Sequence, residues 1–185
     1  MAEYYLISQL PSLDGISESS PMPVTEEQYL ELCERFLGKR ALSELKRISL
    51  VPSRNYEKSS VALIEKWNEG ERNLRLALAK LRAEKMKKDS DVGVQTIPAG
   101  LLQAARAALE IESPMEAEKY LNRLRLEFLE TLRPMDSFSE DFVFYYGLKL
   151  KLLERMRKFD SVSGETAYRK IYDSIMSKDK TEVIQ

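Results

Sequence analysis

Apolar residues recur every three or four positions over most of the chain, and short polar breaks separate the stretches. This spacing places the apolar side chains on one face of an α-helix. Helices are expected over residues 25–37, 42–48, 55–88, 99–111, 114–132, 139–159 and 164–177. The pattern therefore predicts an all-α protein, an elongated antiparallel helical bundle of about six to seven helices in one core or two lobes.

Signals for the start of a helix precede three of these stretches. Thr25 and Gln28 form a capping box, in which two side chains satisfy backbone N–H groups at the helix start. The run Ser113-Pro114-Met115-Glu116 combines an N-cap, a proline at the first helical position and a capping-box glutamate. Ser139 is a third N-cap. Within the longest stretch, Gly70 predicts a kink or a break.

The breaks divide the chain into five predicted segments. Tyr4–Ile7 fits a short strand, an extended arm or a helical turn, and a Ser- and Pro-rich loop follows it. The segments are an N-terminal arm and loop (1–24), a first helical lobe (25–90), a linker (91–98), a second helical lobe (99–178) and a frayed tail (179–185).

The chain contains no histidine, which narrows its function more than any motif does. Histidine is the commonest general base and the commonest metal ligand, so triads, Cys-His pairs and histidine-based zinc sites are excluded. Glu116, Glu118 and Glu127 lack the spacing of a metal or acid/base site and are interpreted as surface charge. No glycine-rich phosphate loop occurs. The sequence therefore indicates a non-catalytic protein without a cofactor or a metal.

Charge and cysteine content restrict the partners and the compartment. With 29 basic and 30 acidic residues the net charge is −1, whereas nucleic-acid binders carry a clear basic excess. The single cysteine, Cys33, is in phase with an apolar stripe, so its side chain is expected to be buried. A lone cysteine cannot form an internal disulfide, which fits a protein of a reducing compartment. Trp67 is likewise expected in the core. Neither a signal peptide nor a membrane-spanning run is present, which predicts a cytoplasmic protein whose membrane contact is only indirect, through a complex.

Two segments carry the residues most typical of protein-partner contacts. The first is strongly basic and follows an acidic stretch, Glu18–Glu34. Such polarity can steer an oppositely charged surface, or the basic residues form a solvated helix face whose last lysines complement the helix dipole. The second holds four aromatic residues within five positions, which cannot all face one helix stripe. The candidate partner-binding residues are Arg72, Asn73, Arg75, Arg82, Lys85, Lys87 and Lys88 in the first segment, and Phe142, Tyr145, Tyr146 and Lys149 in the second.

Three segments resemble a bacterial family of uncharacterised proteins that accompany vacuolar-type (V/A-type) ATPases. They are Tyr4-Tyr5-Leu6 leading to Leu10-Pro11, the run Trp67-Asn68-Glu69-Gly70-Glu71-Arg72-Asn73, and the run Tyr146–Arg155. This family is in turn distantly similar to the socket protein of the rotary ATPase, which is known as its C or d component.

The resemblance implies a structural role. The socket protein is a helical funnel on the membrane rotor ring that holds the central shaft and catalyses nothing. The present chain is much shorter and would supply only part of such a funnel, as a permanent subunit or as an assembly factor. The expected partners are then ATPase subunits of the central stalk or rotor ring. The alternatives are an unrelated helical adaptor or chaperone, and a histidine-free enzyme that uses carboxylate or lysine groups.

Overall fold

The computed structural model describes residues 2–16, 20–53, 58–87, 97–158 and 161–182. These residues form eight α-helices and no β-strand, which confirms the predicted all-α class. The helices are α1 (Ala2–Gln9), α2 (Glu26–Phe36), α3 (Lys39–Arg47), α4 (Ala62–Lys85), α5 (Ala99–Glu110), α6 (Pro114–Thr131), α7 (Glu140–Arg157) and α8 (Ser161–Glu182).

The predicted caps start three of the helices. Thr25 accepts a hydrogen bond from the backbone N–H of Gln28, whose side chain accepts one from Thr25 in return. The hydroxyl oxygens of Ser113 and Ser139 each accept a backbone N–H three residues ahead, at the starts of α6 and α7. These bonds satisfy donors that the first helical turn leaves without an intrahelical partner.

Three boundaries differ from the prediction. Tyr4–Ile7 is helical, within α1, so the predicted arm is in part a helix. The longest helix begins at Ala62 and not near residue 55, because the N–H groups just before it bond to the side chains of Ser59 and Glu65. α8 continues through residues 179–182 of the predicted tail. Residues 91–96 of the predicted linker and residues 183–185 lie outside the described part of the chain.

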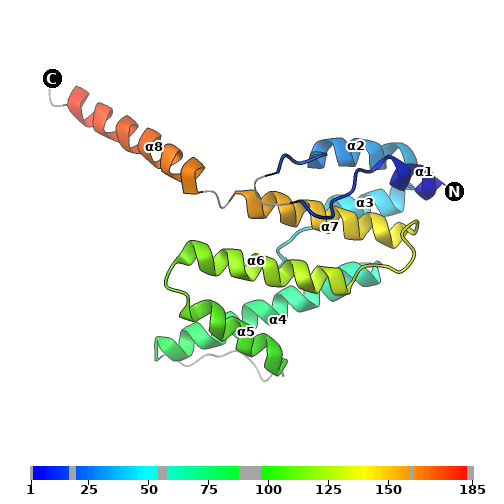
Figure 1. The fold of residues 1–185 in the computed structure, drawn as a ribbon, viewed down its shortest axis with the longest axis horizontal. Helices are drawn as coiled ribbons and strands as arrows, with labels where there is room; N and C mark the ends of the chain where they lie inside the picture. Colours follow the sequence, from blue (N-terminus) through cyan, green and yellow to red (C-terminus); the bar gives the residue numbers. More distant parts are fainter. Residues whose placement is uncertain (1, 17–19, 54–57, 88–96, 159–160, 183–185) are drawn as a thin grey trace.

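Helix α7 lies at the centre of the body (Figure 1). It contacts α1, α2 and α3 on one side and α4 and α6 on the other, while α5 packs on α4 and α6 from the outside. α6 and α7 are antiparallel neighbours. α8 extends away from the body beyond the C-terminal end of α7, and no other described helix contacts it.

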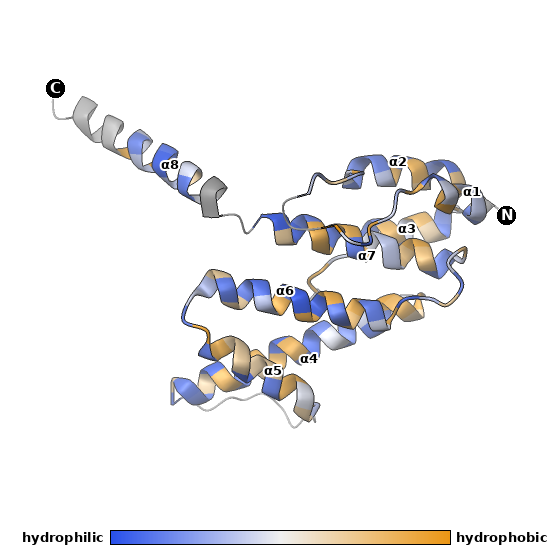
Figure 2. Ribbon diagram, in the orientation of Figure 1, coloured by the Kyte–Doolittle hydropathy of each residue, from blue (hydrophilic) through white to orange (hydrophobic). Residues whose placement is uncertain are grey.

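The apolar interior consists of two clusters, and helices on both sides of α7 contribute hydrophobic residues to it (Figure 2). The larger cluster joins α7 to α1, α2, α3 and the first part of α4. The smaller lies between the second part of α4, α5 and α6. This packing differs from the predicted lobes 25–90 and 99–178, because α7 is buried on all sides and needs helices from the first half of the chain to cover it.

Cys33 and Trp67 are buried in the larger cluster, as predicted. α4 continues without a break through Gly70, so the predicted kink or break does not occur. The absence of a side chain at Gly70 instead allows α6 to pack closely against α4. A Cβ atom at Gly70 would lie 2.3 Å from Cε1 of Phe128 on α6. This close approach lets Trp67 and Phe128 stack with ring centroids 6.2 Å apart.

Candidate interaction surfaces

An apolar groove opens between α4, the start of α5 and the second half of α6. Its volume is about 580 Å³. Trp67 and Phe128 belong to its wall, and a few polar side chains stand at its rim. The large apolar residues that line it are Trp67, Leu74, Leu101, Leu124, Phe128 and Leu132.

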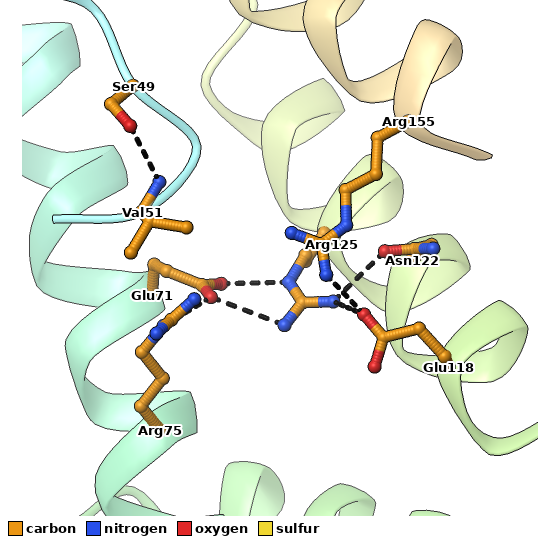
Figure 3. Close-up of polar contacts among 8 residues, drawn as sticks. All are labelled: Ser49, Val51, Glu71, Arg75, Glu118, Asn122, Arg125 and Arg155. Carbon is orange, nitrogen blue, oxygen red and sulfur yellow. Dashed lines mark hydrogen bonds and ion pairs between the residues drawn. The ribbon is translucent and has the colours of Figure 1, made fainter. Parts of the chain in front are cut away.

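A buried ion-pair network lies next to this groove and connects α4, α6 and α7 (Figure 3). Arg125 of α6 donates to both carboxylate oxygens of Glu71 of α4, with N···O distances of 2.9 and 3.2 Å. Arg75 donates to the same carboxylate over 2.8 Å. The side chains of Glu71 and Arg125 are only 2% and 7% exposed, so the bidentate pair is shielded from solvent.

The network continues from α6 to α7 through Glu118. This carboxylate accepts hydrogen bonds from Arg125 over 3.2 Å and from Arg155 of α7 over 2.5 Å. Asn122 accepts a further bond from Arg125 over 3.0 Å. The interpretation of Glu118 as surface charge is therefore wrong, because its side chain is three-quarters buried between two guanidinium groups.

The chemistry of this network is that of a brace between helices. Both carboxylates are paired with the guanidinium groups of arginine side chains. A buried pair of this kind is weak evidence of a gain in stability, and we expect it to fix the relative positions of the helices that carry it. Sequence reasoning missed Glu71 as a buried residue, because its main partner is 54 residues away.

The predicted basic segment divides into two parts on α4. Arg72 and Asn73 are half-buried, and Arg75 pairs with Glu71. Arg82, Lys85 and Lys87 are exposed at the C-terminal end of the helix, where positive charge also complements the helix dipole. Lys88 lies outside the described residues. We name Arg82, Lys85 and Lys87 the basic end of α4.

The predicted aromatic run of α7 lies in the interior. Tyr145 and Tyr146 are 2% and 4% exposed, and Phe142 is half-buried. The hydroxyl of Tyr146 donates to the carbonyl oxygen of Pro11 over 2.9 Å, and its ring stacks on Tyr29 at 5.3 Å. This burial does not support partner contacts by these side chains, because α1 and the segment that follows it already cover them.

Lys149 completes the interior of this region. Its ammonium group lies 2.6 Å from Asp14 and 2.7 Å from Glu130, with the Tyr145 hydroxyl at 3.3 Å. Burial acts to lower the pKa of Lys149, but the hydrogen bonds to the two carboxylates outweigh it and raise that pKa above its ordinary value. The hydrogen bond from Lys149 lowers the pKa of Asp14. These bonds fasten residues 10–16 to α7.

The clearest apolar surface without a covering element belongs to α8. Tyr168, Ile171, Tyr172 and Ile175 lie one turn apart on one face and are 67%, 61%, 50% and 54% exposed. We name these four residues the α8 stripe. Their spacing of i, i+3, i+4 and i+7 places them on one face of the helix, but none was included among the candidate partner-binding residues.

Comparisons with known proteins give one match. Residues 101–179, fewer than half of the 185, match a family described as a protein of unknown function (DUF2764). The match runs from the start of α5 into α8, so it includes Tyr146–Arg155 but neither of the other two segments that resemble the ATPase-associated proteins. No curated protein and no solved structure matches the chain.

Two further classes of site were considered within the described residues. These residues contain no group of three or more acidic or cysteine side chains arranged to hold a metal ion. None of the described helices has the length and apolar character required to cross a bilayer.

Proposed function

We propose that the chain is a non-catalytic subunit or assembly protein of a V/A-type rotary ATPase, similar to the socket protein of that complex, and that it binds the central stalk or the rotor. The proposal rests on the three segments that resemble proteins accompanying these ATPases. α1, α4 and α7 carry these segments, and both α1 and α4 contact α7. Segments far apart in the sequence thus form one continuous body, and that clustering is the observation that supports the proposal best.

The stiffness of this body suits a structural role in a rotary complex. The Glu71–Arg125 pair braces α4 against α6, and Glu118 extends the brace to α7. Lys149 and Tyr146 fasten the N-terminal segment to the same helix. A protein that transmits or resists torque needs such cross-links between rigid helices, and a reactive site is not required for it.

The basic end of α4 is the surface that we assign to the ATPase. Arg82, Lys85 and Lys87 are all exposed and project from one helix end. Clustered positive charge raises the rate of encounter with an acidic surface, and changes at exposed charges affect folding stability by less than about 0.5 kcal/mol. Their replacement therefore separates binding from folding.

Capture of the ATPase from native membranes tests the proposal. The tagged chain, expressed in its own host, is expected to recover the catalytic and central-stalk subunits after mild solubilisation. Recovery should fall at least ~10-fold for Arg82→Glu/Lys85→Glu/Lys87→Glu, the loss that a contributing group of charges produces.

A matched control has the same change in charge at exposed positions elsewhere, Lys39→Glu/Arg40→Glu/Lys158→Glu, and should recover the complex as the unaltered chain does. An intact ATPase in the extract with none of its components recovered by the unaltered chain would contradict the proposed function. Equal recovery by both triple variants would contradict only the assignment to the basic end of α4.

A further inference from the structure

Among the described residues, two apolar surfaces of the same chain lack a covering element. One is the groove between α4, α5 and α6, and the other is the α8 stripe. An amphipathic helix with apolar residues at i, i+3, i+4 and i+7 is the element that such a groove accepts. α8 does not lie in the groove of its own chain, since it contacts no other described helix and extends away from the body.

We infer that two copies of the chain exchange their α8 helices, so that the stripe of each copy lies in the groove of the other. Both copies then present the same two surfaces, and the contact closes with twofold symmetry. This inference is independent of the proposed function, because it concerns contacts between copies of the chain and does not involve an ATPase component.

The area available fits a reciprocal contact better than a single one. Two tyrosines and two isoleucines that are half to two-thirds exposed offer roughly 400 Å² per helix, given about 150–250 Å² for a whole aromatic side chain. The groove exposes less surface than the stripe, because Trp67 and Leu74 in its lining are almost fully buried, so one docked helix buries less than about 800 Å² in total, as weak or crystal-packing contacts do. Two reciprocal sites double that area to more than about 1,000 Å², the size expected of a biological interface.

Charge also favours a protein groove over a lipid surface for α8. Helix 161–182 carries four acidic and four basic residues, whereas a helix that lies on an anionic membrane has a basic excess. The rim of the groove presents exposed Glu69 and Glu127 against the single base Lys66. Arg169, which pairs with Glu165 beside the stripe, complements that rim, whereas Lys170 lies with Asp173 on the opposite face of α8.

The mass of the full chain in solution gives the first test. Sedimentation equilibrium is expected to show a monomer that becomes a dimer as concentration rises, with no larger species. Tyr168→Glu/Ile171→Glu on α8 should raise the dimer dissociation constant at least ~100-fold, because it disables both symmetric sites at once. Met135→Glu, at an exposed apolar residue outside both surfaces, is the matched control and should dimerise normally.

The groove is tested separately. Leu101→Glu introduces a charge into its lining, and unfolding by urea shows whether that variant keeps its fold. Gly100→Lys places a long side chain at the same edge of the groove. It should not create a steric clash within the chain, since a Cβ atom there meets no other atom within 4 Å. Both should remain monomeric. An equimolar mixture of Gly100→Lys and Tyr168→Glu/Ile171→Glu should form a heterodimer with one intact site, detectable only at high concentration and much weaker than the unaltered dimer.

Cross-linking identifies the occupant of the groove. Ile171→Cys in one copy and Leu101→Cys in another should form a disulfide-linked dimer on oxidation, while Asp173→Cys, on the opposite face of α8, should not. Cys33 does not interfere, because it is buried and burial raises its pKa to about 11.

Three results would overturn the inference. The first is a chain that stays monomeric at every concentration. The second is a dimer that survives both sets of changes, since it would use another interface. The third is a disulfide that forms only within one chain carrying both cysteines, since α8 would then occupy its own groove.

Discussion

Helices α7 and α8 follow each other in the chain but have opposite surroundings. α7 is covered by five helices, and Val143–Leu150 are buried without interruption. On α8 the four residues of the α8 stripe share one face, and no described helix covers them. α7 is therefore the axis of the fold, whereas α8 is a surface that the fold leaves for a partner.

The contrast shows which apolar patterns indicate an interface. The aromatic residues of α7 occupy more than one face of the helix, and neighbouring helices cover these faces on both sides. The four residues of the α8 stripe fit one face, and such a stripe is typical of a helix that packs against another element, within the chain or outside it. An interface is therefore recognised by counting the elements available to cover each apolar face, and aromatic density alone does not reveal it.

Truncation of one apolar side chain in each helix should give the largest difference in stability. Phe144→Ala in α7 removes a ring that is 0% exposed and should lower the free energy of unfolding by about 3–5 kcal/mol. Ile175→Ala in α8 should lower it by less than about 0.5 kcal/mol in dilute, monomeric protein. Urea denaturation of both variants measures the two values. Similar losses would mean that α8 packs on the body.

Removal of one partner of the ion-pair network should have the next largest effect. Glu71→Ala leaves Arg125 buried without its bidentate partner, which should cost about 3 kcal/mol, since Glu118 still accepts one of its bonds. The double variant Glu71→Leu/Arg125→Leu should cost clearly less than Glu71→Ala, because it leaves no uncompensated charge in that pair. A double-mutant cycle by urea denaturation measures this. Additive losses would show that the two side chains do not interact.

Loss of one hydroxyl tests how firmly the N-terminal segment is fastened to α7. Tyr146→Phe leaves the carbonyl oxygen of Pro11 without its donor and should lower stability by about 1 kcal/mol. Tyr172→Phe on α8 is the matched control, because its ring is half exposed, and no change is expected in dilute protein. An unchanged Tyr146→Phe variant would mean that water replaces the bond at no cost.

The smallest effect concerns pH. Asp14 has a lowered pKa, so its contribution to stability is present above its ordinary value of 3.8 and is lost as pH falls through the lowered pKa. Lys149 has a raised pKa, so its contribution is present below 10.5 and is lost as pH rises through the raised value. Asp14→Asn should flatten the acid side of the stability profile. An unchanged acid side would show that Asp14 does not hold Lys149.

The sequence predicted those features that depend on neighbouring residues. The caps at Thr25, Ser113 and Ser139 and the stripe of α8 are set by residues within two helical turns, and all of them occur in the structure. Features that depend on distant residues could not be predicted in this way. The pairing of Glu71 with Arg125 requires knowledge of which helix faces α4, and the burial of Tyr146 requires knowledge that residues 10–16 cross α7.

Hydrogen exchange at two protein concentrations tests the contrast between α7 and α8 most directly. Amides of α7 are expected to exchange only through global unfolding, and equally slowly at both concentrations. Amides of residues 164–175 should exchange rapidly in dilute protein and become protected when the concentration favours the dimer. Protection of α8 equal to that of α7 in dilute protein would contradict the account, because α8 would then belong to the folded body and offer no surface to a partner.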